Sequence, residues 1–285
     1  MSTKDVNFRG NNIPIQEFDL NMMCENPAIC MIAKRGSGKS WVCRAIIKHF
    51  NHLPGGVIIA PTDKMNSFYG KFFPDIYIHY KYDSRIVENI LSRQEMMIEK
   101  CKKYLKEGKK VDPRAFLIMD DCLSSKGAWV NEQPIMEIFF NGRHFHLMYI
   151  LTMQFPLGIK PELRGNFDYI FLLAEDFISN QKRIYDHYAG MFPSFETFRQ
   201  VFTQLTDDFG CMVIVNRGPR KNLMEKLFYF KAENEGIEKI GCKQFTDFHD
   251  RNYDQYWKTR RTKFDMNKFI TTKNKPRLVV EKVEN

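Results

Sequence analysis

Short runs of apolar residues alternate with amphipathic stretches along most of this chain. Short apolar runs predict strands at residues 28–32, 57–60, 115–119, 146–152, 169–173 and 211–215, and the continuous run at residues 115–119 predicts a strand that is buried on both faces. Apolar residues at helical spacing predict helices at residues 41–50, 85–110, 134–140, 181–188 and 195–205. The β-rich run at residues 76–80 predicts a further strand. This alternation is typical of an α/β fold with a largely parallel central sheet flanked by helices.

Composition divides the chain into three parts. Residues 1–25 mix polar and apolar side chains and predict an extended arm or an edge strand, whereas residues 26–240 predict one large α/β domain. Residues 243–285 hold eleven Lys or Arg and six Asp or Glu, an excess of five positive charges in a chain with a net charge of +9. Aromatic rings are interspersed among these charges. We therefore expect residues 241–285 to form a basic tail that binds nucleic acid or, alternatively, a segment whose rings dock on the core.

Seven cysteines occur without any C-x-x-C spacing, several of them within apolar runs. This pattern predicts buried free thiols in a reducing compartment, with neither a disulfide framework nor a zinc site. The chain starts without an apolar leader, and its longest apolar stretch, near residues 147–151, is too short to span a bilayer. We therefore expect an intracellular protein with no transmembrane segment.

A phosphate-binding loop is indicated by the run Ala33-Lys34-Arg35-Gly36-Ser37-Gly38-Lys39-Ser40, in which Ala33 replaces the usual first glycine. The glycines allow several backbone N–H groups to point at one anion, and a helix starting near Trp41 adds its positive end. We expect the run and Trp41 to hold ATP. Lys39 would then reach the β- and γ-phosphates, and the Ser40 hydroxyl would ligate Mg²⁺. The alternative is a glycine turn that binds nothing.

Two acids and an amide follow later strands of the predicted sheet. Asp120 and Asp121 close the strand at residues 115–119, where the Mg²⁺-binding acid of a P-loop enzyme belongs. We expect Asp120 to accept from a metal-bound water or from Ser40, and Asp121 to act as general base. Gln154 ends the next strand, where its amide would contact both the γ-phosphate and the attacking water. An ordinary strand end in solvent is the alternative for the two acids.

An arginine that stabilises charge on the transferred phosphoryl group, often from a neighbouring subunit, is a further expected catalytic residue. Arg143, just before the strand at residues 146–152, is the preferred candidate. Rival candidates are Arg35, Arg164 and Arg217. For each of the four, a surface or structural ion pair is the alternative role.

Four features of the chain, in their order and spacing, resemble those of genome-packaging ATPases of large double-stranded DNA viruses. They are the loop, the strand ending in Asp120-Asp121, the segment with Arg143 and the strand ending in Gln154. That group belongs to the FtsK–HerA superfamily of DNA-pumping ATPases, and the resemblance covers about residues 25–235. It implies a RecA-like ASCE core of the P-loop class. In that core, the strand before Gln154 lies between the loop strand and the acidic strand.

The resemblance also implies roles for individual residues. The family's phosphate-loop Lys and Ser correspond to Lys39 and Ser40, its metal-binding acid to Asp120 and its sensor amide to Gln154. Two departures from the family pattern are Ala for the first loop glycine and Asp, rather than the more familiar Glu, as the second acid. The second departure weakens the assignment of a general base.

Function follows from the resemblance as an expectation. It implies an ATP- and Mg²⁺-dependent ATPase that forms a homo-oligomeric ring, threads double-stranded DNA into a preformed capsid and engages a capsid or portal-vertex protein. Such a protein acts in the host cytoplasm or virus factory, with association to the virion as an alternative. The residues also leave open a helicase or segregation ATPase, a small-molecule kinase and a non-hydrolysing, nucleotide-dependent assembly factor.

Overall fold

The computed structural model describes residues 2–8, 10–122, 131–219, 222–233, 236 and 239–256. The chain divides into two units, Met1–Arg251 and Asn252–Asn285. Of the second unit only residues 252–256 are described, so most of the expected basic tail, residues 257–285, lies outside the described residues. The first unit includes residues 1–25, expected as an arm, and residues 241–251, expected as the start of the tail.

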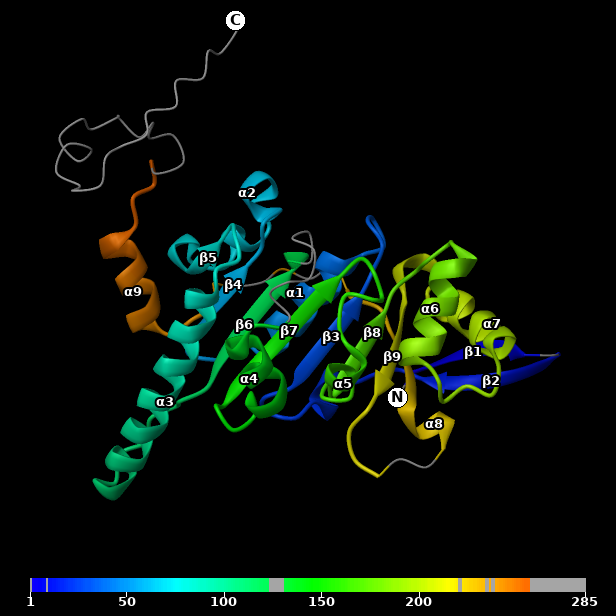
Figure 1. The fold of residues 1–285 in the computed structure, drawn as a ribbon, viewed down its shortest axis with the longest axis horizontal. Coiled ribbons are helices and arrows are strands. Elements are labelled where there is room, and N and C mark those ends of the chain that lie inside the picture. The colour runs from blue at the N-terminus through cyan, green and yellow to red at the C-terminus, as the bar shows by residue number, and fades with distance from the viewer. Residues whose placement is uncertain are drawn as a thin grey trace, which may run out of the picture. The chain divides into compact units, whose positions relative to one another are not determined.

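One large sheet organises the first unit (Figure 1). Its strands, among the described residues, are β3 (Ala28–Ile32), β4 (Gly56–Ile59), β5 (Ile78–His79), β6 (Ala115–Asp120), β7 (Leu147–Met153), β8 (Tyr169–Leu172), β9 (Cys211–Val215) and β10 (Leu227–Phe230). Their spatial order is β10-β9-β8-β3-β7-β6-β4-β5. The strands from β8 to β5 in this order are mutually parallel, whereas β9 is antiparallel to both of its neighbours. The expected largely parallel α/β sheet, with β7 between β3 and β6, is therefore confirmed.

Two strands differ from the expectation. The run at residues 76–80 supplies only the two-residue strand β5, because Asp75–Tyr77 forms a 3₁₀ turn ahead of it. The sequence analysis did not predict β10, which pairs with β9 as an antiparallel edge strand. Both strands are short and lie at the two edges of the sheet.

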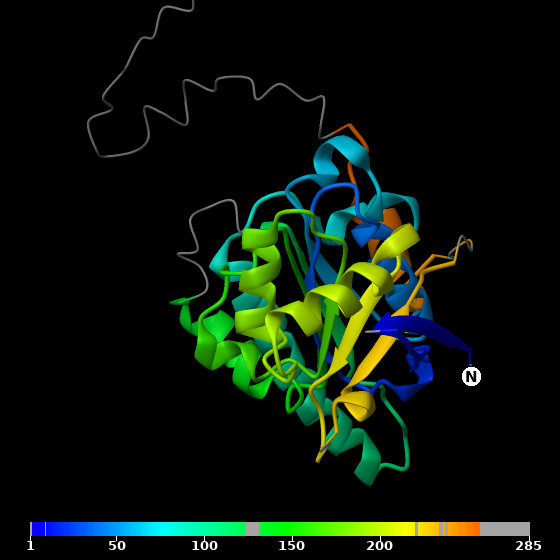
Figure 2. The same cartoon turned by 90° about the vertical axis from the view of Figure 1, so that its right-hand side faces the viewer.

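The core lies on both faces of the sheet, because alternate residues of each buried strand point to opposite sides. In β3, Ala28, Cys30 and Ile32 belong to one apolar cluster, and Ile29 and Met31 belong to the other. The predicted helices cover these clusters: α3 (Ser84–Lys106), α4 (Gln133–Asn141), α6 (Ile178–Tyr188) and α7 (Phe195–Leu205) pack on the first, and α1 (Lys39–His49) packs on the second. Figures 1 and 2 show helices on both sides of the strands.

Shorter elements connect these parts. The remaining helices with described bounds are α2 (Asp63–Asn66), α5 (Pro161–Arg164), α8 (Leu223–Lys226) and α9 (Lys243–Asn252). All seven cysteines are free. Within the described part of the chain, no helix combines the length and the apolar character that crossing a bilayer requires.

The first residues form an antiparallel hairpin of β1 (Thr3–Phe8) and β2 (Asn11–Gln16). Val6 and Ile15 point into the first apolar cluster and are buried. The backbone N–H of Asn7 donates to the Gln204 side chain at 2.9 Å, and the Gln204 amide donates back to the Asn7 carbonyl at 2.9 Å. The expected arm is therefore a hairpin held against α7.

One aromatic ring of the expected tail docks on the core. Phe245, in α9, stacks on Tyr77 with ring centroids 3.7 Å apart and planes 12° from parallel. A Cβ on Gly55 would lie 2.7 Å from the Phe245 ring, so a glycine makes room for it. For this residue the docking interpretation holds, whereas Trp257, Phe264 and Phe269 of the tail lie outside the described residues.

We expect Gly56→Ala to lower the free energy of unfolding by roughly 1–3 kcal/mol, the usual range for overpacking a core. A Cβ at Gly56 would lie 2.4 Å from the backbone oxygen of Phe116 on the paired strand β6, and that oxygen cannot move without disturbing the sheet. Gly165→Ala is the matched control, because its Cβ would meet nothing within 4 Å and its backbone is helical. Urea unfolding of both variants measures the difference, and equal stability of the two would contradict the expected clash.

Candidate nucleotide-binding site

The loop between β3 and α1 has the backbone geometry that anion binding requires. Gly36 and Gly38 have φ angles of 80° and 96°, in the left-handed region that glycine adopts without strain. Gly38 is the N-cap of α1 and has no side chain to cap the helix, so the N–H groups of the first turn point out of its end. The Ser37 hydroxyl donates to the Lys34 carbonyl at 2.8 Å and tightens the turn. The positive end of α1 is thus directed at the space in front of the loop.

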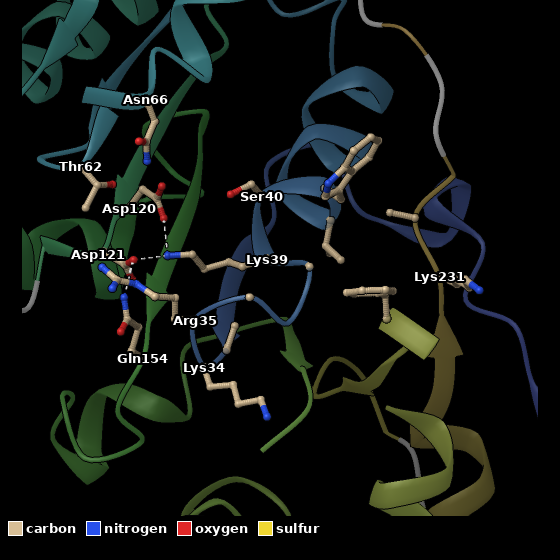
Figure 3. Close-up of a pocket in the computed structure, with 17 residues that line it drawn as sticks. Lys34, Arg35, Lys39, Ser40, Thr62, Asn66, Asp120, Asp121, Gln154 and Lys231 are labelled. Atoms are coloured by element: carbon tan, nitrogen blue, oxygen red, sulfur yellow. Dashed lines mark hydrogen bonds and ion pairs between the residues drawn. The ribbon is translucent and has the colours of Figure 1, made fainter. Parts of the chain in front are cut away.

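A cavity of about 630 Å³ lies in front of this loop (Figure 3). That volume is within the usual range for small-molecule and cofactor sites. Of the nine residues from Ala33 to Trp41 that were expected to hold nucleotide, all but the buried Ser37 line the cavity. Asp120, Asp121 and Gln154 line it as well. Three segments that are distant in the sequence therefore meet here, because the carboxyl ends of the parallel strands β3, β6 and β7 lie at one edge of the sheet.

Lys39 is the centre of the polar contacts in this cavity. Its Nζ lies 3.0 Å from Asp120 Oδ1 and also forms an ion pair with Asp121 Oδ2. The Gln154 side chain donates from Nε2 to the same Asp121 oxygen at 2.9 Å. Figure 3 shows Lys39 reaching from the start of α1 toward both carboxylates. The expected lysine, the two acids and the amide thus form one connected group.

The charges of this group do not balance. Burial alone would lower the pKa of Lys39, but the Asp120 and Asp121 carboxylates outweigh burial and raise it above its ordinary value. Lys39 therefore carries its positive charge throughout the physiological range. One ammonium faces two carboxylates, which leaves one excess negative charge in a site where the side chains of all three are largely buried.

Thr152, a site residue that the sequence analysis missed, connects the two acids. It lies on β7 opposite Asp120 of β6 and is fully buried. Its hydroxyl donates to Asp120 Oδ1 and accepts from the backbone N–H of Asp121 at 3.1 Å. The Lys39 ammonium also donates to it, at 3.3 Å. This one hydroxyl fixes both the Asp120 carboxylate and the backbone that follows it.

The residues of the site fit a Mg²⁺ ion, a hard cation that takes oxygen ligands and keeps several waters and substrate phosphates. Asp120 and Ser40 offer a carboxylate and a hydroxyl to the same cavity, and the group of Lys39, Asp120 and Asp121 has the excess negative charge described above. Asp121 has a φ of 52°, an uncommon conformation for a residue other than glycine. Its Oδ1 is buried with no hydrogen-bond partner among the described residues, so it retains full capacity to accept.

Other residues of the cavity lining also escaped prediction from sequence. Thr62 and Asn66 follow the end of β4, the strand beside β6, and Figure 3 shows them on the side of the two acids. Phe209 precedes β9, and Lys231 follows β10. Thr62 and Asn66 could have been predicted, because they are polar residues that follow the end of a strand. The positions of Phe209 and Lys231 could not, because they depend on the antiparallel pairing of β9 and β10.

The preferred arginine does not reach this cavity in its own chain. Arg143 lies between α4 and the start of β7, at the amino edge of the strands, whereas the cavity lies at their carboxyl edge. Arg164 donates to the Ile159 carbonyl at 3.0 Å, and Arg217 pairs with Asp168 at 3.5 Å. Of the four candidate arginines, all within the described residues, only Arg35 lines the cavity. A role for Arg143 from a neighbouring subunit stays a prediction.

The site has the arrangement of a P-loop NTPase fold. A glycine loop joins a strand to a helix, acids follow a second strand, and an amide follows the strand that lies between these two.

No protein-family model matches the chain. An uncharacterized protein of Acanthamoeba polyphaga mimivirus is 53% identical over 243 residues, which cover 85% of each chain. Uncharacterized proteins of Invertebrate iridescent viruses 6 and 3 are 32% and 31% identical, cover 85% and 83% of this chain, and are themselves covered to 95% and 93%. The chain therefore belongs to this family of large DNA virus proteins.

Solved structures share the fold. The genome packaging NTPase of Sulfolobus turreted icosahedral virus 2, in complex with sulfate, has a TM-score of 0.50 and 18% identity over 75% of this chain and 100% of its own. The pCW3 conjugation coupling protein TcpA with ATPγS has a TM-score of 0.50 and 12% identity over 81% of this chain and 65% of its own. At the level of the fold, these similarities confirm the resemblance to packaging and FtsK-like ATPases.

We expect Thr152→Val to lower the free energy of unfolding by about 1–3 kcal/mol, because the partly buried N–H of Asp121 loses its acceptor. Thr152→Ser, which keeps the hydroxyl, should recover most of that loss. Chemical denaturation of the two variants and the wild type measures the effect. If the Val variant is as stable as the Ser variant, the hydroxyl does not hold the two acids in place.

Proposed function

We propose that this chain is a Mg²⁺-dependent NTPase that hydrolyses ATP and uses the energy to move double-stranded viral DNA into capsids. The observation that carries the proposal is the convergence of Lys39, Asp120, Asp121 and Gln154 in one cavity in front of a glycine loop. Phosphoryl transfer to water requires a cation at the phosphates, an acid that holds the metal, a base and a group that orients the water. The four side chains supply one candidate for each requirement.

In the proposed complex, the triphosphate lies along the loop and accepts hydrogen bonds from the first N–H groups of α1. The Lys39 ammonium then leaves the Asp120 and Asp121 carboxylates and binds the β- and γ-phosphate oxygens. Because it exchanges one set of anions for another, its charge is compensated before and after binding. Mg²⁺, held by Ser40 and Asp120, would neutralise part of the phosphate charge.

The movement of Lys39 also prepares Asp121 for its proposed role. With Lys39 at the phosphates, the Asp121 carboxylate is released from its ion pair and can contact the attacking water instead. Its Oδ1, buried and without a described partner, is available to accept a proton from the attacking water. Gln154 still holds Oδ2 and extends the group to the water and the γ-phosphate. Nucleotide binding and base activation are thereby coupled through one lysine.

A further cation at the γ-phosphate completes the proposed mechanism. Arg143 lies at the opposite edge of the sheet and can serve only from a neighbouring subunit of a ring. Arg35 lines the cavity and is the rival within the same chain. The proposed homo-oligomeric ring therefore matters for chemistry as well as for threading DNA.

Two observations support DNA as the proposed partner. The relatives are proteins of large DNA viruses, and a genome packaging NTPase of another virus shares the fold. The net charge of +9 is suited to a polyanion and would make the interaction sensitive to salt. On this proposal the protein works in the host cytoplasm or virus factory, with a capsid or portal-vertex protein as its further partner.

ATP turnover measured with and without duplex DNA, with particle size recorded in the same samples, tests this proposal. DNA-stimulated hydrolysis by an oligomer supports it. Phosphate transfer to a small molecule without DNA would indicate a kinase instead. Nucleotide binding with no measurable turnover, even with DNA, would indicate an assembly factor.

We expect Lys39→Ala to reduce ATP turnover by roughly 100-fold or more, the loss that follows removal of one preorganised donor to the developing charge. Steady-state phosphate release measures it. Lys48→Ala, in the last turn of the same helix, is the control and should retain wild-type turnover. Full activity of the Lys39 variant would exclude this cavity as the catalytic site.

We expect Gln154→Ala to keep its ATP affinity within about twofold of wild type while losing the stimulation of turnover by DNA. The Gln154 amide contacts Asp121 and does not belong to the phosphate loop, so its removal affects the coupling rather than the binding. Parallel measurements of nucleotide affinity and DNA-stimulated turnover separate the two effects. Gln200→Ala, on α7, is the matched control. Unchanged DNA stimulation in the Gln154 variant would rule out a sensing role.

A further inference from the structure

The cavity has two chemically different ends. Asp120 and Asp121 lie at one end, and Figure 3 shows Lys231 on the opposite side of the loop from them. Phe209 and Trp41 line the cavity together with Lys231. If the γ-phosphate lies at the acidic end, as the proposed function requires, the base of the nucleotide points toward this second end. The sequence analysis assigned no role to Phe209 or Lys231.

Phe209 is held over the loop by an unusual turn. Asp208 and Phe209 have φ angles of 49° and 59°, so two successive residues other than glycine adopt the left-handed conformation. Such residues persist only where the surrounding structure determines their conformation, and they cluster at functional sites. The turn presses Phe209 against the phosphate loop, because a Cβ on Gly38 would lie 3.6 Å from Phe209 Cβ and Cδ1.

Contacts on both sides fix this turn. The Lys231 ammonium, at the end of β10, forms an ion pair with Asp208, and this contact lowers the pKa of the Asp208 carboxyl. The Gly210 N–H donates to the Asp207 carbonyl at 3.0 Å. A Cβ at Gly210 would lie 2.4 Å from the Leu205 carbonyl oxygen, so the chain can close the turn only with glycine there. The strained conformation is therefore maintained from β9, β10 and the end of α7.

The turn leaves Phe209 63% exposed and in the lining of the cavity. No ring or cation contacts it among the described residues, whereas the Trp41 ring already carries the Arg44 guanidinium 4.0 Å from its centroid. We propose that Phe209, positioned by the Asp208–Lys231 pair, is the surface on which the nucleobase stacks when the triphosphate occupies the loop. This inference rests on the proposed nucleotide binding and adds the base subsite to it.

The chemistry of this end also predicts how the base is selected. Of its described lining side chains, Lys231 and the Trp41 indole N–H can form hydrogen bonds, and both are donors only, so neither can accept from the amino group of a base. Recognition then depends on stacking area, which is larger for purines than for pyrimidines and similar for adenine and guanine. We therefore infer a site that favours purine over pyrimidine nucleotides and discriminates weakly between ATP and GTP.

Equilibrium binding with Mg²⁺ present tests the inference on the full chain. The ligands are a slowly hydrolysed ATP analogue, its GTP and CTP counterparts, and inorganic tripolyphosphate, which has no base. We expect Phe209→Ala to weaken the ATP analogue about tenfold, as loss of one base–aromatic stack does, while tripolyphosphate affinity stays unchanged. Phe209→Tyr should bind like wild type, and Phe209→Leu should fall between. Phe177→Ala, which removes a 71% exposed ring outside the cavity lining, is the matched control and should bind like wild type.

The ligands separate failure of this inference from failure of the proposed function. If wild type binds neither the ATP analogue nor tripolyphosphate, the proposed nucleotide site is wrong and the base subsite with it. If wild type binds the ATP analogue and Phe209→Ala binds it equally well, the stacking role alone is overturned. Equal weakening of the analogue and of tripolyphosphate by Phe209→Ala would also overturn it, because the ring would then act through the loop. A wild-type preference for the CTP analogue would contradict recognition by stacking area.

Discussion

The contact of one lysine with two neighbouring carboxylates organises the functional edge of this molecule. Lys39 begins α1, whereas Asp120 and Asp121 end β6, and β7 separates the loop strand β3 from β6. The contact can form only because the three strands are parallel and in register, which brings their carboxyl ends together. It also leaves these three side chains one negative charge in excess, which favours a cation beside the two acids.

The sequence allowed the central part of this arrangement to be predicted. Apolar runs marked the inner strands, and a parallel sheet places residues that follow those strands at one edge, which located Lys39, Asp120 and Gln154 together. Thr152 escaped prediction because its position within an apolar strand says nothing about the direction of its hydroxyl. Arg143 precedes β7 instead of following it. A residue in that position lies at the amino edge of the sheet, away from the cavity in its own chain.

Residues whose position depends on distant packing were harder to anticipate. Residues 1–25 allowed an arm or an edge strand, and only the burial of Val6 and Ile15 against the core distinguishes the hairpin. Phe245 is one of many aromatic residues in a basic stretch, and its place on Tyr77 depends on the absence of a side chain at Gly55. The local pattern of apolar residues does not predict such contacts, because each contact joins segments that are far apart in the chain.

The reversed course of β9 has a mechanical consequence. Because β9 runs against β8, its beginning lies at the same edge as the ends of the parallel strands, and the short connection from α7 must turn sharply to enter it. A strand that slips by one residue in such a pairing turns every side chain to the opposite face. The tight turn at the start of β9 would oppose such a slip. The register between β8 and β9, where the parallel part of the sheet meets the antiparallel part, is therefore fixed next to the cavity.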